Sequence, residues 1–280
     1  MKNLKIILIL LFSLFLIPAS ALSQEKVPSE ENPAGNEIHP EPGEYAVDVL
    51  LPHLWEGTKA SFSRQTIPYW ALAGLAAGLA ATQDKTVHEY WLDHHPLGDW
   101  TALGNGWGNG DNQAGLAIGF LGLGWIANDQ NLATTGEVLM EAQILNGLLT
   151  TAMKQITGRE RPDQSGNDSF PSGHTSDSFC FAAVIDDRYG HYFGIPAYSL
   201  ALLTGLSRME SDKHWLSDVA MGAGLGAIVG YSVSKNHDDY PYEKRWRRTD
   251  KKLVENARLI PILPENEKGG LGIGIYLPLD

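Results

Sequence analysis

The stretch Trp215-Leu-Ser-Asp-Val-Ala-Met-Gly-Ala-Gly-Leu-Gly-Ala-Ile-Val-Gly-Tyr-Ser-Val233 decides the fold, because Asp218 is its only charged side chain. Its length and apolar content are typical of a helix buried in a protein core. Gly and Ala recur through it, and such small side chains let neighbouring helices approach closely. The charge near its start fits a core helix better than a membrane span. We therefore predict a long central helix over this stretch.

Further apolar segments repeat this character along the chain. They are Ile67–Ala81, Ala114–Ala127, Val138–Met153, Asp177–Ile185 and Ile195–Leu206. Several are shorter than the ~20 residues that a bilayer crossing needs, which favours buried helices, with membrane-embedded helices as the alternative. The sequence predicts an all-α helical bundle forming one catalytic domain over residues 46–236.

The composition excludes several classes of protein. Lys and Arg number 21 against 33 Asp and Glu, a net charge of −12, so the chain has no basic field for nucleic acid. A mean hydropathy of −0.17 is too polar for a chain mostly immersed in lipid. The single cysteine, Cys180, excludes an internal disulfide framework and any multi-cysteine metal site. What remains is a globular, acidic protein.

The N-terminus has the order of a secretory signal. Basic residues in Met1–Lys5 precede an uncharged run over Ile6–Ile17 and the small residues Ala19-Ser-Ala21. We predict a signal peptide over 1–21, a flexible leader over 22–45, and export to a periplasmic or cell-envelope location. A retained membrane anchor is the alternative.

Two other segments differ from the apolar helices. Gly104-Asn-Gly-Trp-Gly-Asn-Gly-Asp111 is rich in turn residues and predicts an irregular loop, either a pocket rim or a simple chain reversal. Residues 237–280 read as a charged linker followed by a small C-terminal β-hairpin, since Arg258–Leu263 and the alternating stretch Leu271–Leu277 flank a turn. In the linker, Lys244–Arg248 suggests peripheral membrane contact, although a solvated, salt-bridged face is favoured.

Three short segments gather side chains that bind or attack an anion. The first, Lys154-Gln-Ile-Thr-Gly-Arg-Glu-Arg161-Pro162, can direct an ammonium and a guanidinium toward one point. The second, Phe170-Pro-Ser-Gly-His-Thr-Ser176, predicts a tight turn beside a helix N-terminus, whose free N–H groups suit an anion. Taken singly, the first also fits surface charges near a helix end, and the second fits an ordinary N-cap turn.

The third segment is Ser207-Arg208-Met-Glu-Ser-Asp-Lys-His214-Trp-Leu-Ser-Asp218. If His214 stands in the first turn of the long helix, His214 and Asp218 share a face. The carboxylate could hold one imidazole nitrogen and leave the other as a nucleophile or base. Arg208 adds a fork-shaped anion donor. By itself, a His/Asp pair at this spacing also fits a structural hydrogen bond.

In this order, the three motifs resemble the type 2 phosphatidic acid phosphatase (PAP2) superfamily, which also contains bacterial class A acid phosphatases and vanadium-dependent haloperoxidases. All the signature positions match, from Lys154 to Asp218. The resemblance extends less securely over the helical body, and it excludes the leader and the C-terminal hairpin.

The resemblance implies a role for each residue. His214 is the nucleophile, Asp218 orients it, and His174 protonates the leaving oxygen. The phosphoryl oxygens would be bound by Lys154, Arg161, Arg208, Ser172 and the N–H of Gly173. Three cations and a helix N-terminus suit a phosphoryl group in transfer, which carries negative charge on three equatorial oxygens. A histidine nucleophile divides hydrolysis into formation and breakdown of a phosphoenzyme without requiring a metal.

These observations leave three functions open. The leading one is an exported phosphatase that acts on phosphate monoesters or lipid phosphates. A vanadium-dependent haloperoxidase on the same oxyanion site is the first alternative, and a non-enzymatic cell-envelope protein is the second. No cofactor or metal is predicted: His94-His95 reads as a polar loop, and the remaining histidines, His39, His53, His88, His191 and His237, have no partner at a diagnostic spacing.

Overall fold

The computed structural model describes residues 50–237, 258–262 and 272–276. The signal peptide and leader predicted over residues 1–45 lie outside the described residues, as does most of the charged linker. The described helices are α3 (Leu51–Ser61), α4 (Ile67–Ala81), α5 (Asp84–His94), α6 (Trp100–Trp107), α7 (Gly110–Ala127), α8 (Gln130–Thr157), α9 (Gly173–Tyr189), α10 (His191–Glu210) and α11 (Leu216–His237).

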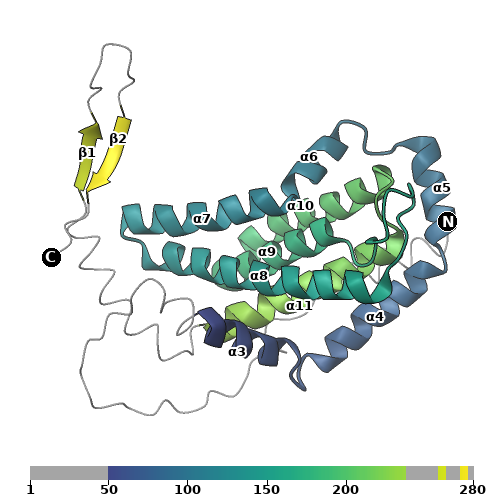
Figure 1. Ribbon diagram of the computed structural model, residues 1–280, viewed down its shortest axis with the longest axis horizontal. Helices are drawn as coiled ribbons and strands as arrows, with labels where there is room; N and C mark the ends of the chain where they lie inside the picture. The colour runs from purple at the N-terminus through teal and green to yellow at the C-terminus, as the bar shows by residue number, and fades with distance from the viewer. Residues whose placement is uncertain (1–49, 238–257, 263–271, 277–280) are drawn as a thin grey trace.

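The body is all-helical, as the sequence predicts. Each of the six apolar segments lies in a separate helix, and the bounds of α4 agree with the prediction at both ends. Helices α7 to α11 run along the length of the body, and α3 and α4 lie below them in Figure 1. Helices α3, α5 and α6 were not predicted from the sequence, because these short helices lack a long apolar run.

Helix α11 is the centre of the body. Leu225 and Val229 pack into an apolar cluster with α7, α8, α9 and α10, while Val219 and Ile228 pack into a second cluster with α4 and α5. Small residues make this double packing possible. A Cβ added at Gly226 would lie 2.0 Å from the carbonyl oxygen of Ser176 on α9. The glycines of α11 therefore allow a close approach to the backbone of α9.

The same helix is long and apolar enough to cross a membrane, and within the described part of the chain it is the single helix that meets this test. However, 89% of its most apolar window is buried inside the body. Within the body, α11 packs as the central helix. The choice between buried and membrane-embedded helices stays a prediction.

The glycine-rich segment from residue 104 to residue 111 is not the irregular loop that the sequence predicts. Residues 100–107 form α6, and α7 begins at Gly110. A Cβ at Gly104 would lie 2.0 Å from Ser207 Oγ, and one at Gly108 would lie 2.3 Å from the Thr204 side chain. These two glycines allow α6 to pack closely on α10. A close helix contact and a turn both favour glycine, so the composition of the segment does not distinguish them.

Two short strands are described beyond the helices. β1 (Arg258–Ile262) pairs antiparallel with β2 (Gly272–Tyr276), and Arg258 lies opposite Tyr276. Both strands fall in the stretches from which the sequence predicts a hairpin. Residues 263–271, which would form the turn, are outside the described residues, so the hairpin as a unit stays a prediction.

The close contact between α9 and α11 yields a first prediction. Gly226→Ala should lower the free energy of unfolding by about 1–3 kcal/mol, because the added methyl group overlaps backbone atoms of Ser176 and Cys180. The matched control is Gly119→Ala on α7, where an added Cβ meets nothing within 4 Å. That change should leave stability equal or raise it by up to about 1 kcal/mol, since Ala favours helix over Gly. Urea unfolding followed by circular dichroism measures both, and equal stabilities would contradict this account of the packing.

Candidate active site

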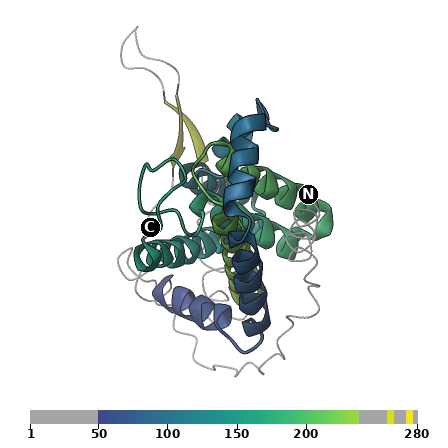
Figure 2. The ribbon, with the colours of Figure 1, turned by 90° about the vertical axis from the view of Figure 1, so that its right-hand side faces the viewer.

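The three motifs of the sequence meet at one end of the body. Lys154 lies in the last turn of α8, Ser172 is the N-cap of α9, and Arg208 lies in the last turn of α10. This is the right-hand end in Figure 1, which faces the viewer in Figure 2. Segments up to 64 residues apart in the chain, from Lys154 to Asp218, therefore contribute to one site.

Asp218 is the fully buried centre of this arrangement. Its Oδ1 accepts a hydrogen bond from Arg159 Nη1 at 2.6 Å. Its Oδ2 accepts from Ser169 Oγ at 2.5 Å and from the backbone N–H of Trp215 at 2.8 Å. A buried carboxylate needs such partners to stay ionised. The network holds Asp218 in one orientation beside His214.

His214 lies two residues before the first residue of α11 rather than in its first turn, which corrects the sequence interpretation. It still faces Asp218, with Nδ1 3.7 Å from Oδ2. That separation is too long for a hydrogen bond, and Nδ1 has no hydrogen-bond partner in the described part of the chain. Burial lowers the pKa of His214, so the imidazole is neutral at neutral pH.

Three cations surround the two histidines. Lys154 donates to the backbone oxygen of Asp168, and Arg161 makes a two-pronged ion pair with the Asp168 carboxylate, at 2.8 Å for each bond. Arg208 Nη1 donates to Asn105 Oδ1 at 2.7 Å, while its buried Nε has no partner among the described residues. Burial lowers the pKa of Arg208 to about 10, so the guanidinium remains charged.

His174 experiences all of these charges. Burial, followed by the charges of Arg208, His214, Arg161 and Lys154, lowers its pKa to about 4. The imidazole is thus neutral in the empty site at pH 7. An anion placed among the cations would act in the opposite direction and raise the pKa of His174.

The N-terminus of α9 forms the floor of the site. Gly173 and His174 are its first two residues, so their N–H groups have no partner within the helix. Ser172 caps the helix by position but makes no side-chain cap bond; its Oγ accepts from Thr175 Oγ1 at 2.8 Å. The Ser172 N–H donates to the backbone oxygen of Asp218 at 3.0 Å, which fixes this turn against α11.

All eight residues predicted for the site are at this end of the body. Lys154, Arg161, Arg208 and both histidines are close enough for their charges to interact, and one backbone hydrogen bond joins Ser172 to Asp218. One prediction needs adjustment. Asp168 already binds one edge of the Arg161 guanidinium group, through Nε and Nη2, so a ligand would have to be bound through the remaining donors.

Four residues of the network were not assigned from the sequence. They are Arg159, which bridges Asp218 and Asp84, Ser169, which binds Asp218, Asp168, which binds Arg161, and Asn105, which binds Arg208. Arg159 is within the first motif, two residues before Arg161, and this position could have identified it as a site residue. Asn105 had a weaker signal in the glycine-rich segment that contains it.

Part of the chain matches a known protein family. Residues 138–240 match the model of the PAP2 superfamily, and that range includes all eight predicted site residues. The Lipid A 1-phosphatase of Porphyromonas gingivalis is 39% identical over 89 residues, which are 31% of this chain and 20% of that protein. The Lipid A 4'-phosphatase of Helicobacter pylori is 29% identical, over 36% of this chain and 51% of that protein. The chain thus spans about half or less of these relatives.

A crystal structure described as the first transmembrane PAP2 type phosphatidylglycerolphosphate phosphatase, from Bacillus subtilis, is also similar. It has a TM-score of 0.41 and 20% identity, and the match covers 69% of this chain and 96% of that chain. A TM-score at this level does not establish a common fold.

The buried network around Asp218 yields a second prediction. Arg159→Met removes the cation that Asp84 and Asp218 share, and should lower the free energy of unfolding by roughly 2–3 kcal/mol. Arg159 is 30% exposed, so the loss should be below that of a fully buried pair. The control, Lys59→Met, breaks the exposed pair with Glu56 and should cost less than about 1 kcal/mol. Comparable losses in thermal unfolding for the two variants would contradict a structural role for Arg159.

Proposed function

We propose, from the match of residues 138–240 to the PAP2 superfamily, that the chain is a phosphoric ester hydrolase that removes phosphate from lipid phosphates. The observation that carries the proposal is the convergence of Lys154, Arg161 and Arg208 on His174 and His214. Such a cluster of cations repels itself unless an anion occupies it, and a phosphoryl group has the required charge.

In the proposed reaction, His214 attacks phosphorus through Nε2, because its Nδ1 faces Asp218. The lowered pKa keeps the ring neutral, so its lone pair is available. The bond from phosphorus to the ester oxygen breaks as the bond to nitrogen forms. Asp218 then stabilises the positive charge that develops on the imidazole, and contraction of the 3.7 Å separation would give a hydrogen bond. Water hydrolyses the phosphohistidine in the second step.

His174 supplies the proton to the departing oxygen. Its pKa of about 4 in the empty site makes it a poor proton carrier at neutral pH. A bound phosphate dianion would raise that pKa, so the acid becomes protonated when substrate is present. In this proposal the three cations, the Ser172 hydroxyl and the N–H of Gly173 would bind the remaining phosphoryl oxygens.

Apolar side chains around the site support a lipid substrate. Ile156, two residues beyond Lys154, is 83% exposed, and Trp100 on α6 is 64% exposed. Leu103 is also exposed and is two residues from Asn105, which binds Arg208. Large exposed apolar groups at the same end of the body as the charged cluster suit a ligand with a phosphate head and an acyl chain. The named activities of the similar lipid A phosphatases agree with this substrate class. Export and contact with a membrane surface are parts of the same proposal.

A third prediction separates the roles of the two histidines. His214→Ala should abolish turnover of every phosphate ester, because it removes the nucleophile. His174→Ala should slow hydrolysis of alkyl phosphates by about 10²- to 10⁴-fold and that of nitrophenyl phosphate much less, because a nitrophenolate leaves without a proton. Steady-state kinetics over a series of leaving groups measures both effects.

Trapping of the phosphoenzyme is the accompanying control. His174→Ala should still accumulate phosphate on His214 from an activated ester, and His214→Ala should not. Equal losses for alkyl and aryl esters in His174→Ala, or a phosphoenzyme in His214→Ala, would overturn these roles.

A fourth prediction concerns the lipid. Trp100→Ser should raise the KM for dioctanoyl phosphatidic acid by about 10-fold or more, the order expected from losing one buried apolar side chain, and leave the kinetics of nitrophenyl phosphate unchanged. The matched control is Tyr192→Ser, which removes an exposed aromatic residue at the other end of α10. A parallel comparison of phosphatidic acid, a polyprenyl diphosphate, a lipid A analogue and a soluble sugar phosphate tests the substrate class. Preference for the soluble ester would refute the lipid proposal.

A further inference from the structure

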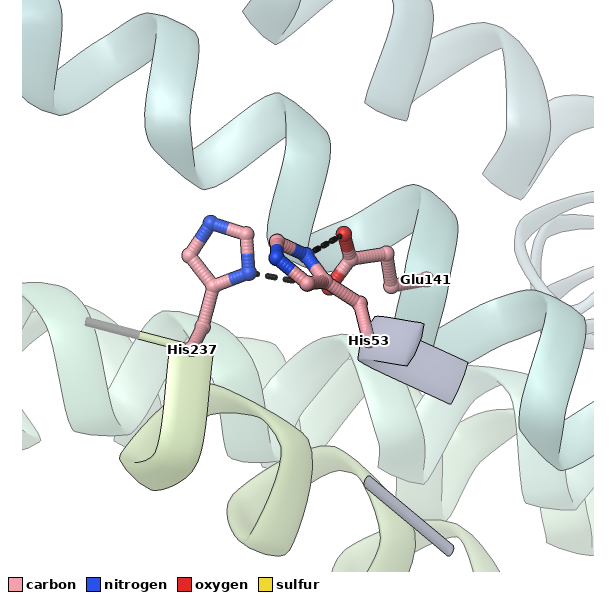
Figure 3. A group of neighbouring side chains, drawn as sticks. All are labelled: His53, Glu141 and His237. Carbon is pink, nitrogen blue, oxygen red and sulfur yellow. Dashed lines mark hydrogen bonds and ion pairs between the residues drawn. The ribbon is translucent and has the colours of Figure 1, made fainter. Parts of the chain in front are cut away.

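A second cluster of ionisable side chains is buried away from the candidate active site. It consists of His53 in the first turn of α3, Glu141 in the middle of α8 and His237 at the last residue of α11. In Figure 3 the three side chains point toward one another from three different helices. In the part of the chain that the structure describes, this is the one group of three or more His, Cys, Asp or Glu residues close enough to bind an ion together.

The contacts within this cluster are short. The Nδ1 of His53 donates to Glu141 Oε1 at 2.6 Å, and the Nδ1 of His237 donates to Glu141 Oε2 at 2.9 Å. The two rings are edge-to-face, with centroids 5.2 Å apart. Both imidazoles thus present the same nitrogen to one carboxylate. Neither contact could be predicted from the sequence, because 88 residues separate His53 from Glu141 and 96 residues separate His237 from Glu141.

The cluster is buried, which is unusual for a carboxylate such as Glu141. All three side chains are at most 10% exposed. Each of its two oxygens accepts one imidazole N–H, so both histidines are held against a single buried carboxylate. One turn earlier on α8, Glu137 brings a second carboxylate within 3.9 Å of the His237 Nε2.

We infer that His53, Glu141 and His237 form a binding site for a divalent transition-metal ion, with Zn²⁺ as the best fit. Two imidazole nitrogens and one carboxylate oxygen are a ligand set that zinc accepts. The three ligand atoms lie within 4.8 Å of one another. Tetrahedral bonds of about 2.0–2.2 Å place ligand atoms roughly 3.4 Å apart. On binding an ion, the two hydrogen-bonded N–O distances would therefore lengthen, and the widest distance between ligand atoms would shorten by roughly 1.4 Å. The ion takes the place of the Nδ1 proton of each histidine, and each ring carries its proton on Nε2 instead, so both ligands are neutral imidazoles.

The position of this site assigns it a structural function. Glu141 and Lys154 are thirteen residues apart on α8, a separation of about 20 Å along the helix. An ion at Glu141 is therefore too far away to contact a phosphoryl group held by Lys154. It instead joins α3 and the end of α11 to the middle of α8. Metal binding should stabilise the fold and leave the chemistry unchanged.

The test uses the full chain purified with a tag that contains no histidine. The protein is loaded with Zn²⁺ alone, passed through a desalting column and analysed by mass spectrometry for metal content. We expect one zinc ion per chain, a rise in Tm on loading, and cobalt substitution that gives the visible absorption of a tetrahedral site. His53→Ala, His237→Ala and Glu141→Gln should each weaken zinc binding by more than roughly 100-fold, beyond the loss typical of an outer-shell partner.

Two variants separate a metal site from a hydrogen-bonded cluster. Glu141→Gln keeps the shape but removes the charge and replaces one of the two oxygen acceptors by an NH2 group, so a cluster held by hydrogen bonds alone would lose stability and show no dependence on zinc before or after the change. His191→Ala is the matched control, because it removes another His–carboxylate pair, with Asp186 at 2.7 Å, at the exposed start of α10. It should bind zinc as the unchanged protein does.

Activity distinguishes this inference from the proposed function. Removal of zinc by a chelator should lower Tm while turnover of nitrophenyl phosphate at low temperature stays the same. The inference is overturned if the unchanged protein retains no zinc and gives no cobalt spectrum, or if Glu141→Gln binds zinc as tightly as the unchanged protein. The measurement on the unchanged protein decides the question even if a histidine variant fails to fold.

Discussion

The burial of the Asp218 carboxylate is the constraint on which the rest of the site depends. A buried carboxylate is stable only when hydrogen-bond donors and a cation replace its hydration, and here they come from three separate parts of the chain. Arg159 comes from the first segment, Ser169 from the approach to the second, and the Trp215 N–H from the third. Because all three bonds end on one side chain, the loop between α8 and α9 has to close over the start of α11. The same closure places the N-terminus of α9 opposite His214.

The cations of the site are compensated only in part, and this imbalance gives the pocket its chemistry. Asp168 neutralises Arg161, whereas Arg208 is held by the neutral amide of Asn105, and Lys154 by a backbone oxygen. Burial and then this excess positive charge lower the pKa of His174 to about 4. A dianion entering the pocket would relieve that repulsion and restore a proton to His174. Under the proposed function, binding of the substrate would thus prepare the acid that the reaction needs.

The sequence predicts features that depend on residues close together in the chain, and it does not predict contacts between residues far apart in the chain. The helices around Ile67–Ala81 and Trp215–Val233 follow from local apolar composition, and the site residues follow from three short motifs. Asn105 could not be assigned, because its partner Arg208 is 103 residues away. Glycine was ambiguous for a different reason. A turn and a close helix contact both require the absence of a side chain, and Gly104 and Gly108 serve the contact. Composition alone does not separate these two uses.

Helix α11 connects the two polar clusters of the body, and this explains why so apolar a helix carries ionisable residues at both ends. Asp218 lies in its first turn and His237 is its last residue, and between them the helix packs closely against its neighbours. A close-packed helix cannot shift along its axis without breaking many contacts at once. The attachment of His237 to Glu141 on α8 therefore limits movement of Asp218 at the other end, although the two residues never meet. The precision that phosphoryl transfer demands of His214 would then rest on packing along the whole helix as well as on the bonds around Asp218.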